Sequence, residues 1–251
     1  MTPVLLQLPY SPWSERARWA LDAKGIEYTQ RRYQPLLGEP ELRRRLRRWR
    51  GPVSVPVLLT DEGALADSVE IARWADAHGS GPTLFPSDEV VRWASRSQDG
   101  LAAGRAVSLT RVLAMPDALD ELTPPWARKL GAVGRAVTKA GVARTRRKYG
   151  GSAQTDAEHQ ANLEAVLDEL RAALKGRATI LDAFSFADIA MAQVLCFVAV
   201  PDRRWVKLGK ANAAAFGDPE LAKRYADLVG WRDALYARYR EREATATNVA
   251  S

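Results

Sequence analysis

The chain has 251 residues with 37 basic and 30 acidic side chains, a formal net charge of +7. This length is enough for two domains of ordinary size, each with its own core. No run approaches the ~18 uncharged apolar residues of a membrane span, and the N-terminus lacks the basic and apolar regions of a signal peptide. We therefore expect a cytoplasmic protein without a membrane span.

Cysteine and histidine are scarce in this sequence. Its one cysteine, Cys196, excludes an internal disulfide and a thiolate metal cluster. The two histidines, His78 and His159, have no neighbouring residues that would complete a set of metal ligands. We expect no metal site, and we expect Cys196 to be a buried, unreactive thiol because it lies in an apolar helical pattern.

The excess positive charge is concentrated in residues 43–50 and 128–148, and no acidic residue occurs between Glu121 and Asp156. A basic excess of this kind is typical of nucleic-acid or anionic-surface binding. Solvated helix faces explain most such runs, however. We therefore expect no nucleic-acid partner.

About the first 80 residues alternate between strand and helix patterns. The expected elements are strand 4–8, helix 12–24, strand 26–33, helix 39–49, strand 53–60, strand 64–66 and helix 68–77. In helix 12–24, for example, the apolar residues Trp13, Ala17 and Leu21 recur at helical spacing. This order predicts a small sheet covered by helices, with a parallel first crossover and an antiparallel later hairpin, which is the thioredoxin-like arrangement.

From about residue 88 onward the pattern is helical throughout. The expected helices are 89–113, 126–149, 156–174, 186–200 and 219–242. The fold class is therefore α/β followed by all-α: a thioredoxin-like domain at 1–82 and an all-helical domain at 88–245, with a linker near 80–88. We expect residues 245–251 to fray because they have little to bury.

Three short motifs could form one site: Ser11-Pro12 before the first helix, Val55-Pro56 before a strand, and Asp67-Ser68 at the start of a helix. Each has an ordinary explanation. Serine before proline is a common start of a helix, and proline is often found at a strand edge in the trans form. Asp67 with Glu70 could form a capping box. Their order and spacing make the combination informative.

Residues 8–21, which include Ser11-Pro12-Trp13-Ser14, resemble the first strand-to-helix turn of the cytosolic glutathione S-transferase superfamily, in its serine or cysteine branch nearest the tau, zeta and omega classes. Residues 184–190 resemble the family's buried helix cap, which uses Ser185 and Asp188. The resemblance implies a thioredoxin-like glutathione-binding domain, a glutathione transferase C-terminal domain that carries the co-substrate pocket, a homodimer, and a role in detoxification.

By this resemblance Ser11 is the catalytic residue, and its chemistry follows from thiol acidity. A thiol with a pKa near 8.5 is mostly protonated at neutral pH, whereas the thiolate is the nucleophile. A hydroxyl donor at the positive end of a helix favours the anion. Lowering the thiol pKa by about two units requires ~2.7 kcal/mol. Ser11 would therefore donate to the glutathione sulfur, with Tyr10 as a weaker rival donor.

The other predicted contacts to glutathione follow from the same resemblance. Val55 and Pro56 match the family's cis-proline turn, whose backbone pairs with the cysteinyl part as an added strand would. Asp67 and Ser68 match the pair that holds the γ-glutamyl group. Trp13 is expected to contribute to the same site. A cation for the glycyl carboxylate would come from the arginines at 43–50, and Arg45 is our choice, with Arg48 as the alternative.

We therefore expect a glutathione S-transferase that conjugates the glutathione thiolate to a small apolar electrophile. A glutathione-dependent isomerase or dehalogenase would use the same thiolate, and another low-molecular-weight thiol could replace glutathione. A different class of protein is also compatible with the sequence. It is a transferase-like, non-catalytic scaffold whose basic helical surface at 128–148 docks on an anionic membrane, a nucleic acid or an acidic partner.

Overall fold

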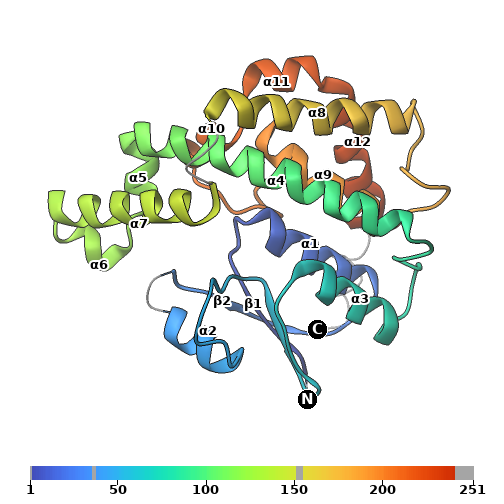
Figure 1. Ribbon diagram of the computed structural model, residues 1–251, viewed down its shortest axis with the longest axis horizontal. Coiled ribbons are helices and arrows are strands. Elements are labelled where there is room, and N and C mark those ends of the chain that lie inside the picture. The colour runs from blue at the N-terminus through green and yellow to red at the C-terminus, as the bar shows by residue number, and fades with distance from the viewer. Residues whose placement is uncertain (1, 36–37, 151–154, 241–251) are drawn as a thin grey trace.

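The computed structural model describes residues 2–35, 38–150 and 155–240 (Figure 1). A small sheet with helices is followed by a mostly helical region, which confirms the predicted fold class. In the described ranges, no helix combines the length and the apolar character needed to span a membrane.

The sheet has four strands in the order β2-β1-β3-β4. Their bounds are β1 Val4–Gln7, β2 Thr29–Arg32, β3 Val57–Thr60 and β4 Gly63–Leu65. β1 is parallel to β2 and antiparallel to β3, and β3 and β4 form a hairpin. All four residues of β2 are exposed, as expected of an edge strand.

Helices cover both faces of the sheet. α1 (Pro12–Ala23) and α3 (Ser68–His78) lie together on one face, where Leu5 and Leu58 pack against Leu21 and Ile71. Leu6 points to the other face and packs with Leu42 of α2 (Glu39–Arg45). Successive residues of a strand point to opposite faces, which explains how the apolar pair at the centre of β1 serves both cores.

Three elements of this domain are clearly shorter than predicted, and the first is β2, which covers Thr29–Arg32 instead of 26–33. β3 begins at Val57 instead of residue 53, because Pro56 has no N–H to donate to a strand ladder. α2 ends at Arg45 instead of residue 49, and Arg47 adopts a left-handed conformation with φ 50°. A residue in this conformation cannot continue a right-handed helix.

The helical region is built around α4, which packs against α8 and α9 (Figure 1). The helices are α4 Glu89–Ala114, α5 Pro116–Leu122, α6 Pro125–Arg128, α7 Ala132–Gly150, α8 Asp156–Leu174, α9 Phe186–Val194, α10 Lys210–Phe216, α11 Pro219–Arg224 and α12 Ala226–Leu235. A 3-10 turn, Leu195–Phe197, follows α9, and a π-helical turn, Tyr236–Arg240, follows α12. A Cβ at Gly104 would lie 2.4 Å from the Phe197 ring, so glycine is needed where α4 meets that turn.

The predicted helices at 126–149 and 219–242 are both interrupted. The first is divided into α6 and α7 by a turn in which Gly131 has φ 56°. The second is divided at Tyr225, and its last predicted residues lie outside the described ranges, as does the predicted fraying tail at 245–251. α5 and α10, each seven residues long, were not predicted from the sequence.

The segment from α5 to α7 forms an arm that projects from the helical bundle, and α7 returns toward α4 (Figure 1). The returning end of α7 contacts the N-terminal domain. The Lys148 ammonium donates to the Val53 carbonyl at 2.8 Å, and Arg144 lies 3.8 Å from Glu39. These contacts bring the basic segment beside the residues that precede β3.

Helix α1 belongs to the cores of both regions. Trp19 is fully buried, and its ring centroid lies 4.5 Å from that of Tyr236 and 6.1 Å from that of Phe184. The opposite side of α1 packs Ala17 and Leu21 against the sheet. The two regions are therefore joined through one continuous apolar contact.

A buried ion network reinforces the contact at α1. Glu15 has no exposed surface, and its carboxylate accepts from Arg18 at 2.6 Å and from Arg240 at 3.1 Å. Arg240 also pairs with Asp22, and Arg18 donates to the Trp205 carbonyl at 2.8 Å. These ion pairs and hydrogen bonds thus link α1 to residues of the helical region.

Replacing Arg240 by leucine should destabilise the fold by about 3–5 kcal/mol, because Glu15 would keep a buried charge with one partner fewer. Urea denaturation of Arg240→Leu against the wild type measures this loss. The matched control is Arg238→Leu, which removes the same charge from an exposed position of the same turn and should change stability by less than about 0.5 kcal/mol. Equal losses in both variants would contradict a special role for the network.

The predicted helix cap at the start of α9 is present. The Asp188 carboxylate accepts from the backbone N–H of Ser185 at 2.9 Å and of Ile180 at 2.8 Å. Burial raises the pKa of Asp188 to about 6, against these hydrogen bonds, which lower it. The folded protein therefore retains a proton here that the unfolded chain releases between about pH 4 and pH 6.

The stability that this proton contributes is present at low pH and is lost as the pH rises through 6. We expect Asp188→Asn to fall further below the wild type at pH 4.5 than at pH 7, by about 1–2 kcal/mol. Urea denaturation of both proteins at the two pH values gives the comparison. A larger gap at pH 7 would show that the pKa of Asp188 is not raised.

Candidate active site

Ser11 is the residue before α1, and its backbone is extended, with φ −88° and ψ 126°. Its carbonyl accepts from the Glu15 N–H at 3.0 Å, whereas its hydroxyl makes no capping hydrogen bond to the helix. The side chain is half-buried. Ser14 differs: it is fully buried, and its hydroxyl accepts from the Leu8 N–H at 3.2 Å. Of the two serines, only Ser11 has a hydroxyl available to a ligand at the positive end of the helix.

The Val55–Pro56 peptide bond is cis, as in the turn that these residues resemble. The antiparallel register pairs Val57 with Leu6. Residues just before Val57 therefore lie beside those just after Leu6, where the chain runs toward Ser11. This places Val55, which is half-buried, and Ser11 at the same end of the sheet.

Asp67 and Ser68 mark the start of α3. Asp67 is exposed, and its carboxylate accepts from the Val69 N–H at 2.7 Å. Ser68 is buried. The expected capping box is not completed, because the Glu70 carboxylate accepts from Ala66 instead of Asp67. Asp67 alone caps this helix.

Arg45 is engaged within its own helix. Its guanidinium donates to Glu41, one turn earlier, at 2.7 Å, and Arg43 makes the same kind of pair with Glu39 at 2.8 Å. Pairs at this spacing are ordinary features of helix surfaces. The cation that the structure brings to the residues before Val55 is instead Lys148, through its hydrogen bond to Val53.

Residues 10–78 match the family model described as the glutathione S-transferase N-terminal domain. Two curated relatives are named probable glutathione S-transferases. The protein from Solanum tuberosum is 30% identical over 110 residues, and the one from Nicotiana tabacum is 31% identical over 106 residues. Each match covers 39% of this chain, which spans under half of the length of these relatives, 46% and 45% respectively.

Solved structures match nearly the whole chain. A glutathione transferase family member from Pseudomonas fluorescens Pf-5 with bound glutathione has a TM-score of 0.60 at 17% identity, covering 94% of this chain and 95% of that one. The beta-etherase LigF from Sphingobium sp. strain SYK-6 has a TM-score of 0.63 at 17% identity, with 98% and 100% covered. Residues 10–78 therefore resemble a glutathione S-transferase N-terminal domain, and the chain as a whole has the fold of these solved structures.

Arg16 is a further candidate site residue that was not predicted from the sequence. The residue is only 1% exposed, and its Nε and Nη1 atoms have no hydrogen-bond partner. Burial lowers the pKa of Arg16 to about 10, and the negative charge of Asp67 opposes that effect. The guanidinium is therefore charged at neutral pH, close to the start of α3. The sequence does indicate that Arg16 is unusual, because a charged residue stands on the apolar face of the helix, three residues after Trp13 and four before Ala20.

Trp13 lies at the boundary between the two regions. Its indole N–H donates to Gln98 of α4 at 2.7 Å. The guanidinium carbon of Arg105, also on α4, lies 4.4 Å from the centroid of the Trp13 ring and 4.2 Å from that of Tyr149. The first turn of α1 is thus joined to α4 and to the end of α7. The contacts of Arg105 could not be predicted from the sequence, because its two partners are far apart along the chain.

Of two other candidates, Cys196 is buried and Tyr10 is half-buried. The Cys196 thiol has no exposed surface, and burial raises its pKa to about 12, so it is unreactive, as predicted. Burial also raises the pKa of Tyr10, which makes this phenol a poor source of a phenolate. Its ring packs against the cluster that contains Cys196. In the described ranges there is no group of three or more side chains suited to hold a metal ion.

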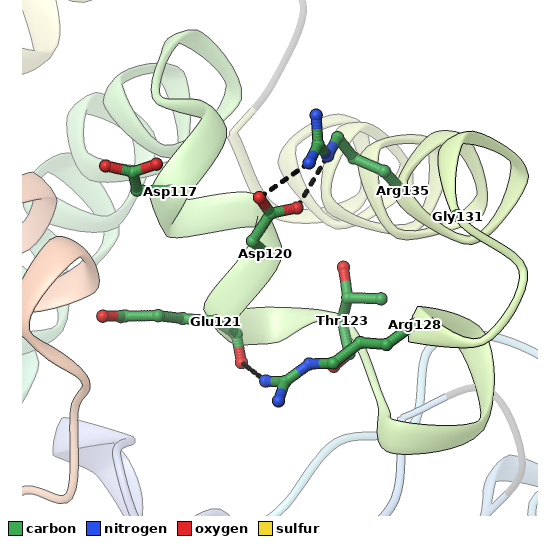
Figure 2. Close-up of a pocket in the computed structure, with 7 residues that line it drawn as sticks. All are labelled: Asp117, Asp120, Glu121, Thr123, Arg128, Gly131 and Arg135. Atoms are coloured by element: carbon green, nitrogen blue, oxygen red, sulfur yellow. Dashed lines mark hydrogen bonds and ion pairs between the residues drawn. The ribbon is translucent and has the colours of Figure 1, made fainter.

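The structure also has a cavity of about 510 Å³ in the arm (Figure 2). It is lined by Asp117, Asp120, Glu121, Thr123, Arg128, Gly131 and Arg135. Several of its charges are already engaged: Arg135 donates to both oxygens of Asp120 at 2.6 and 2.8 Å, and Arg128 donates to the Thr123 carbonyl at 2.9 Å. None of the predicted site residues lines this cavity.

Proposed function

We propose that this chain is a glutathione S-transferase that uses Ser11 to stabilise the glutathione thiolate and delivers it to an electrophile. The observation that carries the proposal is the uncommitted Ser11 hydroxyl at the start of α1. The cis Val55–Pro56 turn at the same end of the sheet supports it. By the family resemblance, the proposal extends to a cytoplasmic homodimer.

Glutathione would bind along three short segments. The backbone of Val55 pairs with the cysteinyl part in the manner of an added strand. The γ-glutamyl carboxylate meets the Ser68 hydroxyl and the first-turn N–H groups of α3 other than that of Val69, and the ammonium meets the exposed Asp67. Arg16 adds a buried positive charge behind Asp67. This arrangement directs the sulfur toward the start of α1.

The reaction then depends on ionising the thiol. The Ser11 hydroxyl donates to the sulfur, and the α1 dipole favours its negative charge. The thiol proton is released to solvent, and the thiolate attacks the electrophile. Ser11 supplies a hydrogen bond and is not itself the nucleophile.

Several related reactions begin with the same thiolate. Isomerisation returns free glutathione, reductive dehalogenation oxidises it, and conjugation retains it in the product. The similarity to a beta-etherase adds ether cleavage by thiolate substitution to this class. Mass analysis of the glutathione species after turnover distinguishes these reactions. We favour conjugation because it requires only the thiolate that this site is built to stabilise.

Replacing Ser11 by alanine should lower kcat for conjugation at neutral pH by about 10–100-fold, because one hydrogen bond to the thiolate is worth ~1.5–3 kcal/mol. The KM for glutathione should change by less than about threefold. The acidic limb of the pH profile should move to higher pH, since the thiol pKa rises.

The conservative variant Ser11→Thr keeps the hydroxyl and should recover part of the rate. Steady-state kinetics of both variants across pH 5.5–9 provide the data. If Ser11→Ala has an unchanged kcat and the acidic limb of its pH profile does not move, Ser11 does not stabilise the thiolate.

Replacing Arg16 by methionine should weaken glutathione binding by about tenfold or more, because a charged partner of the γ-glutamyl site is lost. Calorimetric titration with glutathione measures the affinity, and thermal denaturation shows whether the variant is folded. Arg16→Lys keeps the charge and should bind more tightly than Arg16→Met.

Arg73→Met is the matched control. Arg73 lies on α3 but is exposed, with its guanidinium 4.6 Å from the Phe85 ring. It should bind glutathione as the wild type does. If Arg16→Met is folded and also binds normally, Arg16 serves the fold alone.

A further inference from the structure

Arg105 differs from the other arginines of α4. The helix carries four of them, and three are paired: Arg92 and Arg96 with Glu169, and Arg111 with Asp218. Arg105 has no ion pair among the residues that the structure describes, and its buried Nε has no hydrogen-bond partner. Its contacts are instead the rings of Trp13 and Tyr149.

This environment is costly for a cation without an anionic partner. Burial lowers the pKa of Arg105 to about 10, so the side chain remains charged at neutral pH. Two aromatic faces offset part of the lost hydration, by about 2 kcal/mol or less each. The edge of a guanidinium stacked on rings remains free for the bidentate hydrogen bonds that carboxylates accept.

A second cation lies close to Arg105. The Lys148 ammonium is 4.8 Å from the Tyr149 ring, which Arg105 also contacts. It also donates to Val53, two residues before the turn at Val55. Trp13 lies two residues after Ser11, in the first turn of α1. The two cations and two rings thus form one connected group that reaches the first turn of α1 and the residues before Val55.

We propose that Arg105, supported by Lys148, is an anion-binding subsite for the electrophile, and that the preferred co-substrate is an aromatic electrophile with a carboxylate. Its carboxylate would pair with the guanidinium edge, and its apolar body would lie against Trp13. This inference rests on the proposed transferase function and narrows the predicted small apolar electrophile to one that also carries a carboxylate.

A matched pair of electrophiles separates the contribution of the carboxylate. 4-Chloro-3,5-dinitrobenzoate and 4-chloro-3,5-dinitrobenzamide react in the same way. The glutathione sulfur bonds to the ring carbon that bears chlorine, chloride leaves with the bonding electron pair, and the thiol proton goes to solvent. Only the benzoate carries the negative charge that Arg105 would recognise.

Binding is measured first, without glutathione, so that the result does not depend on transferase activity. The probes are 3,5-dinitrobenzoate and 3,5-dinitrobenzamide, which lack the leaving group, and the method is calorimetry. We expect the wild type to prefer the benzoate by about tenfold or more, as a charged bidentate pair allows. Arg105→Gln should abolish this preference, and Arg105→Lys should retain part of it. Equal binding of the two probes to the wild type would overturn the proposal.

Rates are measured second, each divided by the uncatalysed rate with glutathione. We expect Arg105→Gln to lose about tenfold in kcat/KM for the benzoate and little for the benzamide. Arg92→Gln is the matched control, because it removes an exposed arginine of the same helix about 20 Å away. It should keep the benzoate preference.

Equal losses on both electrophiles, with a shifted acidic limb of the pH profile, would show that Arg105 acts on the thiolate and would overturn the proposal. If the wild type conjugates neither electrophile but prefers 3,5-dinitrobenzoate through Arg105, the proposed function fails and the anion subsite stands. If the wild type conjugates both electrophiles but shows no preference for the benzoate, the proposed function stands and the anion subsite fails.

Discussion

The burial of α1 between two cores is the constraint on which the rest of the structure depends. Its apolar residues pack on the sheet on one side and on the helical region on the other. The fully buried Glu15 carboxylate connects Arg18 of the same helix to Arg240 near the end of the described chain. A helix held on both sides cannot tilt without disturbing both cores. The position of the Ser11 hydroxyl is therefore fixed by contacts far from it.

Arginine pairing separates structural charges from candidate ligand contacts. Arg16 and Arg18 are two residues apart and point to different sides of α1. Arg18 is buried with Glu15 and Gln7 as partners, whereas two guanidinium nitrogens of Arg16 have none. A buried charge is stable when it is paired, and an unpaired one raises the energy of the empty protein. Binding of a substrate carboxylate would remove that cost, which is why we assign the unpaired arginines to ligands.

Sequence patterns predicted the elements that local residues determine. The first helix and α8 follow from periodicity and from start and stop residues, and the cap of α9 from Ser185 and Asp188. The errors came from long-range structure. α5 and α10 are short and are defined by packing around Phe216 and Val112. The break in the predicted helix at 126–149 required a left-handed turn at Gly131, which a single glycine does not establish.

The residues of the candidate site also fall into two groups: those that sequence motifs predict and those that only the folded structure identifies. Ser11, Val55 and Asp67 stand at the ends of elements, where sequence motifs are informative, and the structure places Ser11 and Val55 at one end of the sheet. Arg16 and Arg105 were missed because the lack of a partner is a property of the folded chain. No local pattern distinguishes Arg105 from Arg92 or Arg96, which pair with Glu169 on a different helix.

The arm also changes the interpretation of the basic segment at 128–148. A helix that binds nucleic acid or a membrane needs its cations exposed and unpaired. Here Arg135 pairs with Asp120, Arg146 with Asp156, and Arg144 lies within 4 Å of Glu39. Lys148 is bound to the backbone of the N-terminal domain. Much of this positive charge therefore holds the arm against its own chain, and this favours an intramolecular role: the arm carries Tyr149 and Lys148 to the proposed site.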